Sequence, residues 1–280
     1  MPNEALFRPI GRTRVMGILN ITTDSFSDGG AYLDLPQAIA HAEEMVAAGA
    51  DIIDVGGEST RPGATRVTAE VETQRVVPVI RELCERGIAC SVDTMRATVA
   101  AAAVDAGAVL INDVSGGLAD PAMYAVMADT AVPCALMHWN TQAFGDAAGQ
   151  GEHEGDVINH VYTHLQRCTD AALATGVTAD NIIWDPGLGF AKNAQENWQL
   201  LAGLPRLREA GFPVLVGASR KRFLVALRTE RGMEAGPQDA DAASAAITAL
   251  AAQAGAWAVR VHDAAASRDA VTVASYWQRG

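Results

Sequence analysis

Two aspartates and an asparagine lie where chemistry is expected. Asp93, Asn112 and Asp185 each interrupt or follow a short apolar run. A carboxylate accepts two parallel hydrogen bonds from the edge of an amidine- or guanidine-like ring, and an asparagine offers both a donor and an acceptor. Around one cavity, these side chains suit a planar, nitrogen-rich heterocycle. The same oxygens also suit a metal ion, and the residue types alone do not separate the two.

Basic residues predict an anion site nearby. The segment GASRKRF (217–223) follows an apolar run and opens a helical pattern, so N–H groups at a helix start would lie beside Lys221. The net charge of −12 means that an anionic ligand needs such a local cluster. A solvated basic patch is the plainer alternative. The cations expected at this site are Arg61, Arg220, Lys221, Arg222, Arg260 and His262.

The metal chemistry that the sequence favours is that of a hard cation. No cluster of three His or Cys ligands is visible, which argues against zinc, whereas Asn20 offers an amide oxygen. Mg²⁺ commonly uses one or two protein oxygens together with substrate phosphates and water. The sequence also lacks GxxxxGK[ST], GxSxG, HExxH and a strand-flanked GxGxxG, so nucleotide hydrolysis, serine-esterase and NAD chemistry lose their main support.

Eight short apolar runs must position these residues. Continuous apolar runs of this length are typical of strands buried on both faces. The expected strands are 14–20, 51–56, 89–94, 109–115, 133–139, 181–187, 213–219 and 257–263. Helical patterns alternate with them, most followed by a glycine that supplies a left-handed C-cap. The expected helices are 36–48, 69–86, 95–106, 121–128, 156–174, 194–210, 239–254 and 266–278.

This alternation predicts an α/β fold, a single (β/α)₈ TIM barrel with parallel strands that forms one domain over residues 1–280. A doubly wound open sheet is the alternative. In a barrel, the carboxyl ends of the strands meet at one mouth, where active sites lie. The polar residues expected to converge there are Asn20, Asp93, Asn112, Asp113, His138, Asp185, Ser219, Arg260 and His262. Asp113 and Ser219 could instead only cap helices.

Four of the βα connections are long, namely loops 1 (21–35), 2 (57–68), 5 (140–155) and 7 (228–238). Long barrel loops are usually lids or binding loops, with disorder as the alternative for the fifth and seventh. Phe26 lies in a polar stretch of loop 1, where an exposed aromatic ring is unfavourable. Either this ring tucks into the core or the loop closes over a ligand.

Composition excludes several kinds of partner. With 280 residues and 49% apolar content, the chain can bury a large core. Its pI of about 4.9 opposes binding to nucleic acid or to an anionic membrane surface. Without a signal peptide or a CxxC pair, the four cysteines are expected to be buried thiols in the cytoplasm. The apolar stretch 242–259 contains Ser, Thr and Gln and predicts a buried helix and strand, not a membrane span.

Seven motifs, taken in order, resemble the dihydropteroate synthase family: MGILNITTDSFSDGG, DVGGESTRPGA, SVDTMRA, INDVSGG, DPGLGFAK, GASRKRF and VRVHD. They cover about residues 14–263, and MHWN and SRKRF are most similar to actinobacterial members. The resemblance implies that (7,8-dihydropterin-6-yl)methyl diphosphate condenses with p-aminobenzoate to give 7,8-dihydropteroate and pyrophosphate. This is the step of folate biosynthesis that sulfonamides block. Mg²⁺ as cofactor and a homodimer are also implied.

The resemblance further implies residue roles. Pterin binding falls to Asp93, Asn112, Asp185, Lys221 and Arg260. Pyrophosphate binding falls to Thr60, Arg61, Arg260 and His262. The p-aminobenzoate pocket comprises Phe26, Thr60, Pro62, Lys221 and Arg222. Asn20 resembles the Mg²⁺ ligand, and the catalytic residues would be Asp28, Arg61, Lys221 and Arg260.

In the reaction that the resemblance implies, pyrophosphate leaves before the amine attacks. The enzyme then needs charge stabilisation and exclusion of water rather than a nucleophile. On this interpretation Phe26 covers the aminobenzoate ring when its loop closes. Thr23 stands where many relatives have Pro, and Arg222 where many have Ser. The segment after His138 also lacks the Gln-Gly-Pro pattern of many bacterial members.

The sequence leaves three alternatives, of which a barrel that acts on some other phosphorylated metabolite is the least specific. A pterin-dependent methyltransferase barrel would share the acids but has no need for SRKRF or the Ser-Asp-Phe loop. A non-catalytic pterin-binding paralogue should have lost loop or lysine residues, whereas Asn20, Arg61, Lys221 and Arg260 are all present.

Overall fold

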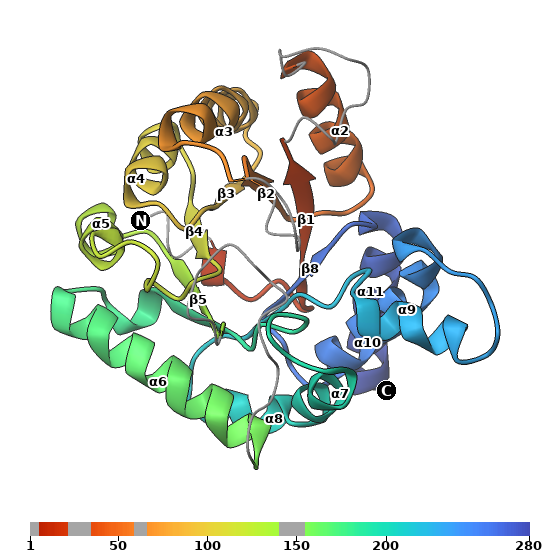
Figure 1. Cartoon of the computed structure of the whole chain (residues 1–280). Helices are drawn as coiled ribbons and strands as arrows, with labels where there is room; N and C mark the ends of the chain where they lie inside the picture. The colour runs from red at the N-terminus through yellow and green to blue at the C-terminus, as the bar shows by residue number, and fades with distance from the viewer. Residues whose placement is uncertain (1–5, 22–34, 59–65, 140–154) are drawn as a thin grey trace.

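The computed structural model describes residues 6–21, 35–58, 66–139 and 155–280. Within these ranges, eight parallel strands form one sheet in the order β6-β5-β4-β3-β2-β1-β8-β7. A parallel bridge between Trp184 and Val214 joins β6 to β7 and closes the ring. Figure 1 looks into this ring, with the helices arranged around the outside. The expected (β/α)₈ barrel is therefore confirmed.

Six of the eight strands end one to three residues earlier than the sequence predicted, whereas β1 and β2 end where expected. Only the first strand has the bounds expected. The strands are β1 (Arg14–Asn20), β2 (Ile52–Gly56), β3 (Cys90–Asp93), β4 (Leu110–Asp113), β5 (Cys134–Met137), β6 (Ile182–Asp185), β7 (Leu215–Val216) and β8 (Ala258–Val261).

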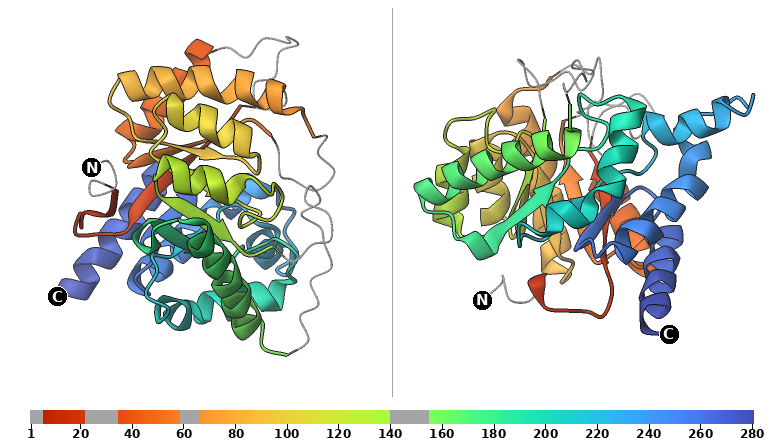
Figure 2. Two further views of the ribbon diagram at one scale, coloured as in Figure 1. Left: turned by 90° about the vertical axis from the view of Figure 1, so that its left-hand side faces the viewer. Right: turned by 90° about the horizontal axis from the view of Figure 1, so that it is seen from below.

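The helices form a layer around the barrel, as the two side views in Figure 2 show. They are α2 (Leu35–Ala47), α3 (Ala69–Glu85), α4 (Ala97–Asp105), α5 (Met123–Thr130), α6 (Val157–Thr175), α7 (Ala194–Ala202), α8 (Leu204–Arg208), α9 (Arg222–Thr229), α10 (Asp241–Gln253) and α11 (Ala264–Arg279). Short 3₁₀ helices, η1 (Ala179–Asn181) and η2 (Pro237–Ala240), precede β6 and α10.

Two helix predictions needed correction. The single helix expected at 194–210 is two, α7 and α8, which meet at Gly203. A Cβ at Gly203 would lie 2.5 Å from Cδ1 of Ile158, so close packing against α6 excludes a larger residue at the break. The seventh connection is also less irregular than expected, because α9 runs to Thr229 and η2 begins at Pro237.

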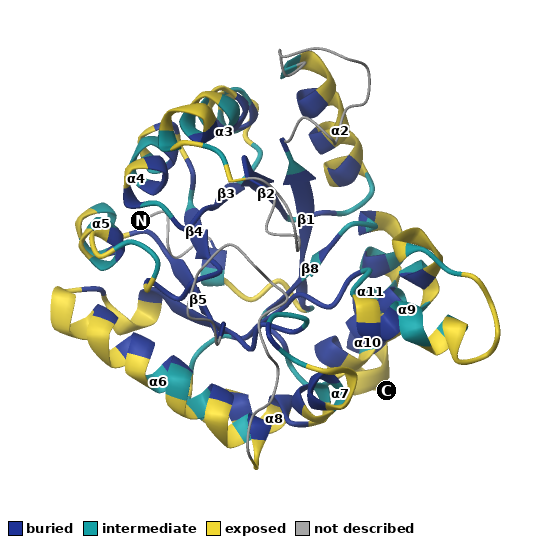
Figure 3. Cartoon of the chain, viewed as in Figure 1, coloured by how far each residue is buried: buried dark blue, intermediate teal, exposed yellow. Residues whose placement is uncertain are grey.

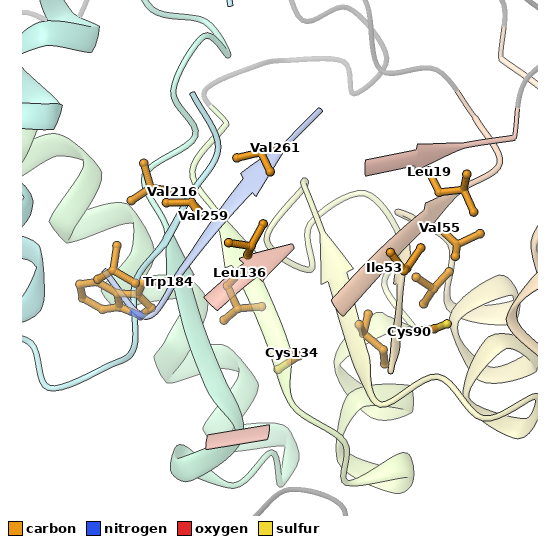
Figure 4. Close-up of a cluster of buried hydrophobic side chains, with 14 of the residues drawn as sticks. Leu19, Ile53, Val55, Cys90, Cys134, Leu136, Trp184, Val216, Val259 and Val261 are labelled. Carbon is orange, nitrogen blue, oxygen red and sulfur yellow. The ribbon is translucent and has the colours of Figure 1, made fainter. Parts of the chain in front are cut away.

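The outward faces of the strands form the main core with the helices. Figure 3 shows the helices buried on the side that faces the barrel and exposed on the other. Figure 4 shows part of this layer, with labelled side chains Leu19, Ile53, Val55, Cys90, Cys134, Leu136, Trp184, Val216, Val259 and Val261. Of the four cysteines, which are all free, Cys84 is half-buried and the other three are buried, close to expectation.

The barrel interior is apolar at the amino ends of the strands and polar toward the carboxyl ends. A second buried cluster fills the lower interior with Leu6, Met16, Ile52, Leu110, Ala135, Ile183, Leu215 and Ala258. Two residues further along five of these strands stand Ile18, Asp54, Asn112, Asp185 and Arg260. Because side chains alternate along a strand, these residues share the inward face, and four of the five are polar. The apolar layer supports a polar layer at the mouth.

Candidate active site

Strand register places one row of side chains at the mouth. Asn20 pairs with Gly56, Gly56 with Asp93, and Asp93 with Asn112, across β1, β2, β3 and β4. Gly56 leaves room in this row, because a Cβ there would lie 3.5 Å from Oδ1 of Asn20 and 3.6 Å from Oδ2 of Asp93. The two polar side chains therefore face the same space.

Arg260 on β8 is the centre of the polar layer. Its Nε donates to Oδ2 of Asp54 at 2.6 Å, and its Nη2 donates to Oδ2 of Asp93 at 2.6 Å. Burial works to lower the pKa of Arg260, but the two carboxylates outweigh it, and the pKa is raised above its ordinary value. Burial raises the pKa of Asp93 to about 7, against the opposing charge of Arg260. The guanidinium is thus fixed in orientation from two sides.

Asp54 is a site residue that the sequence interpretation missed. It is fully buried and accepts hydrogen bonds from Oγ of Ser91 at 2.5 Å and from Nδ2 of Asn112 at 3.0 Å, besides that from Arg260. The signal was present in the run IIDVG, where one acid interrupts four apolar or small residues. Asp54 lies in the middle of its strand, whereas the residues predicted for the site lie at or near strand ends.

Two acceptors in the layer are available to a ligand. Oδ1 of Asn112 is buried and has no hydrogen-bond partner among the described residues, while its Nδ2 is held by Asp54. Oδ1 of Asp185 accepts from the backbone N–H of Gly187 at 2.7 Å. Its Oδ2 lies 4.0 Å from where a Cβ on Gly217 would stand. Burial raises the pKa of Asp185, and the charge of Lys221 opposes the rise. A buried acceptor without a donor is costly unless a ligand supplies one.

Lys221 reaches the same space from the start of α9. Its Nζ would lie 3.9 Å from a Cβ on Gly217, and it donates to the carbonyl oxygen of Leu188. It also stands 4.8 Å from the ring centroid of Phe190. Burial lowers the pKa of Lys221 to about 8, with the carboxylate of Asp185 opposing. The structure therefore brings Asp93, Asn112, Asp185, Lys221 and Arg260 together, and adds Asp54.

The other predicted cations lie in different surroundings. His262 and Ser219 join the ends of β8 and β7, with Nδ1 of His262 lying 3.1 Å from Oγ of Ser219. Arg222 is exposed at the first turn of α9. Arg220 is not at the mouth as expected, because its Nε and Nη2 donate to both carboxylate oxygens of Asp241 on α10, at 2.6 and 2.8 Å.

Asp113 also does not face the mouth. Its carboxylate accepts from the backbone N–H groups of Ser115 and Gly117, both at 2.8 Å, and from the Ser115 hydroxyl at 2.7 Å. Burial raises the pKa of Asp113 to about 6, with the Ser115 bonds opposing. The carboxylate stabilises the turn after β4 and does not cap the next helix, because α5 begins only at Met123, after Ala122 at the N-cap.

Three histidines that are distant in sequence meet beside the mouth. The ring of His138, at the end of β5, lies 5.3 Å from that of His160 and 4.6 Å from that of His164, both on α6. Sequence spacing gave no sign of this cluster. Even so, the described ranges contain no group of three His, Cys, Asp or Glu arranged to hold a metal ion. Lys192 approaches the cluster with Nζ 2.9 Å from Nδ1 of His138.

Five predicted residues, Phe26, Asp28, Thr60, Arg61 and Pro62, lie outside the described ranges. The residues that flank positions 59–65 are held by hydrogen bonds. Glu58 accepts from Nε of Arg66 at 2.8 Å, from the N–H of Val67 at 2.9 Å and from Nη2 of Arg96 at 2.9 Å. Arg96 also donates to the buried carboxylate of Glu72 on α3. This network fixes the two ends of loop 2 at the rim of the barrel.

Asn20 could supply one oxygen ligand to a hard metal ion such as Mg²⁺. It is half-buried at the last position of β1, and Gly56 keeps the space before its Oδ1 open. One amide oxygen suits Mg²⁺ only if phosphate oxygens and water complete the shell. The donor set thus fits a magnesium ion that arrives with a phosphorylated substrate.

Comparison with known proteins identifies the relatives of this chain. The family model described as "Pterin binding enzyme" matches residues 16–262. The chain is 50% identical over 265 residues to the dihydropteroate synthase of Mycobacterium leprae, covering 94% of this chain and 93% of that protein. This agrees with the expected likeness to actinobacterial members.

Solved structures of dihydropteroate synthases are also similar to this chain. The dihydropteroate synthase of Xanthomonas albilineans with 4-aminobenzoic acid superposes with a TM-score of 0.87 at 45% identity, covering 96% of this chain and 94% of that one. The Yersinia pestis dihydropteroate synthase in a sulfonamide complex gives 0.88 at 38% identity, covering 97% and 96%. As to membranes, none of the helices described is both long and apolar enough to span one.

Proposed function

This chain belongs to the pterin-binding enzymes and, among them, to the dihydropteroate synthase family, and on that basis we propose how its residues divide the work. The reaction joins (7,8-dihydropterin-6-yl)methyl diphosphate to p-aminobenzoate and releases pyrophosphate, in folate biosynthesis. One bond forms between the exocyclic methylene carbon and the aniline nitrogen. One bond breaks between that carbon and the diphosphate oxygen, and the amine loses a proton.

The unpartnered acceptor of Asn112 carries the proposal for the pterin site. Its buried Oδ1 and the carboxylate of Asp185 are oxygens that ring N–H and amino groups would satisfy. Asp93 would bind the same heterocycle, with Asp54 holding Asn112 and Arg260 in place. A planar donor-rich ring is the ligand that such a set of acceptors suits.

Arg260 would act on both the pterin and the leaving group. The carboxylates of Asp54 and Asp93 fix the orientation of its planar guanidinium, so that one face can stack on the pterin ring. Together with His262, Thr60 and Arg61, it would bind the pyrophosphate whose charge grows as the bond to carbon breaks. Mg²⁺, when bound by Asn20 and the diphosphate, would add charge stabilisation.

The aminobenzoate site is proposed beside the pterin site. Lys221, whose stem lies against the β6–α7 loop, would form one wall, with Phe26, Thr60, Pro62 and Arg222 as the other members. Asp28 and Arg61 would act from the first two loops. We propose that closure of those loops excludes water from the reactive carbon.

The test is pyrophosphate release. Purified protein is incubated with the dihydropterin diphosphate and Mg²⁺, with and without p-aminobenzoate, and the pterin product is identified. Release coupled to 7,8-dihydropteroate is the expected result. Pterin binding without product would instead indicate the non-catalytic paralogue, and methyl transfer from a folate would indicate the methyltransferase.

The assembly and location are also proposals. We propose that the chain forms one functional domain, that it works as a homodimer and that it acts in the cytoplasm, as the family resemblance implies. Sedimentation velocity at micromolar concentration should give the mass of two chains. A monomer at that concentration with full activity would contradict the dimer.

A further inference from the structure

The chain contains only two lysines, Lys192 and Lys221, and both bind the same short loop. This loop connects β6 to α7. Nζ of Lys192 donates to the carbonyl oxygens of Gly187 at 2.9 Å and Phe190 at 3.1 Å. Lys221 donates to the intervening carbonyl oxygen of Leu188. All other cations in the chain are arginine, apart from histidine, so the binding of both lysines to carbonyl oxygens of one loop points to a specific requirement.

Lys192 is itself a residue of this loop, whereas Lys221 contacts the loop from the start of α9. Lys192 contacts Nδ1 of His138, a residue with no exposed surface at the end of β5. The loop is pressed onto that strand end, because a Cβ on Gly187 would stand 1.9 Å from the carbonyl oxygen of His138. Gly187 has a φ of +67°, which favours glycine. Lys192 therefore joins the loop to the end of β5.

The loop carries several parts of the proposed site. Oδ1 of Asp185 accepts from the N–H of Gly187, so a shift of Gly187 moves the carboxylate. The ring of Phe190 packs against Trp139 at 5.0 Å between centroids and faces the ammonium of Lys221. If the loop moved, the pterin acceptor and the aminobenzoate wall would move together.

A buried ammonium is an expensive way to fill this space, because an apolar side chain would avoid its desolvation. The groups that face it are Lys221, Asp185, Glu196, His138 and His164. Burial, with the added effect of the Lys221 charge, lowers the pKa of Lys192 to about 7. What the ammonium offers in return is three donors that can bind several backbone carbonyls at once.

We propose that Lys192 is a positioning residue of the synthase, which fixes the β6–α7 loop and through it Asp185 and Lys221. The proposal rests on the function proposed above. It also makes a claim about the free protein, because the loop should loosen without Lys192 even when no substrate is present.

The test uses the fact that lysine is rare in this chain. Selective ¹³C labelling of the lysine Cε atoms should give two NMR signals in the wild type and one, from Lys221, in Lys192→Met. We expect the titration midpoint of Lys221 to rise from about 8 toward its ordinary value in the variant, because the charge of Lys192 is removed and because water reaches Lys221 when the loop loosens. The pterin affinity reports the loosening separately from the charge. We also expect the Kd for the dihydropterin diphosphate to rise at least tenfold.

Leu83→Ala is the matched control, since Leu83 is fully buried on α3 outside the barrel and its loss lowers stability without touching the loop. An unchanged Lys221 midpoint with pterin Kd within twofold of wild type would overturn the proposal. The proposal would also be overturned if Leu83→Ala weakened pterin binding as much as Lys192→Met does, at the same fall in melting temperature.

Two further outcomes are also decisive. If the wild type makes no dihydropteroate, the proposed function fails, while the Lys221 midpoint still decides the positioning role. If Lys192→Met does not fold, Lys192→Gln replaces it. Its amide has two donors instead of three and a shorter side chain, so it should hold the loop only in part, and the Lys221 midpoint and the pterin Kd should shift in the same directions by smaller amounts.

Discussion

Replacing Asp54 by Asn tests whether the buried ion pairs hold the active site together. Asp54→Asn keeps the shape of the side chain but removes its charge from Arg260, which lies 2.6 Å away. Breaking a buried pair costs about 3–5 kcal/mol. Because Asp93 still pairs with Arg260, we take the lower figure, about 3 kcal/mol.

This loss of unfolding free energy corresponds to a fall in the melting temperature. An unfolding entropy of about 2.1 cal/mol/K per residue gives about 0.6 kcal/mol/K for 280 residues, so the melting temperature should fall by about 5 °C. The pterin affinity should fall about tenfold or more, because Arg260 and Asn112, which both donate to Oδ2 of Asp54, would face a neutral amide instead of a carboxylate. Calorimetry and fluorescence titration with the dihydropterin diphosphate measure the two quantities.

Asp51→Asn is the matched control. Asp51 makes a similar pair, with both oxygens 2.7 Å from the guanidinium nitrogens of Arg12, but it precedes β2 at the opposite end of the barrel. It should lose stability without losing pterin affinity. A double-mutant cycle of Asp54→Asn with Arg260→Met isolates the coupling. Simple additivity of the two stability losses, or equal pterin affinity in Asp54→Asn and wild type, would refute the reasoning.

Four other changes have definite expected outcomes. Gly217→Val should weaken pterin binding at least tenfold with little change in melting temperature, because its side chain would enter the ligand space; unchanged titrations would contradict this. Arg220→Ala should leave KM for both substrates within twofold and lose about 1 kcal/mol in a denaturant melt, since its charge serves Asp241. Asn20→Ala should raise the Mg²⁺ concentration needed for half-maximal rate, and an unchanged Mg²⁺ titration would count against the ligand role. The folded-state pKa of Lys192, about 7 against an ordinary 10.5, makes the unfolded chain bind more protons above pH 7. Wild-type stability should therefore gain about 1.2 kcal/mol relative to Lys192→Met between pH 7.5 and 8.5 in urea melts, and a gap independent of pH would show that Lys192 does not titrate there.

Much of the site was predictable because a parallel barrel turns sequence position into spatial position. Once eight apolar runs are aligned, the residues at their carboxyl ends must meet, and Asp93, Asn112, Asp185 and Arg260 did meet. Asp54 was missed because the pleat, and not the strand end, decides which side chains face inward. Its alternation with the apolar Ile52 could have identified it.

Sequence by itself determined the fold class, the order of the elements and the types of chemical group at the mouth. Those features follow from local periodicity and from residue type, which neighbours in the chain can specify. Only the tertiary structure decided the partners of each charge. Arg220 turned to Asp241, Asp113 to its own turn, and Lys192 to a loop and a distant histidine. These choices depend on distances of a few ångströms between elements far apart in sequence, because burial makes each charge take the nearest available partner.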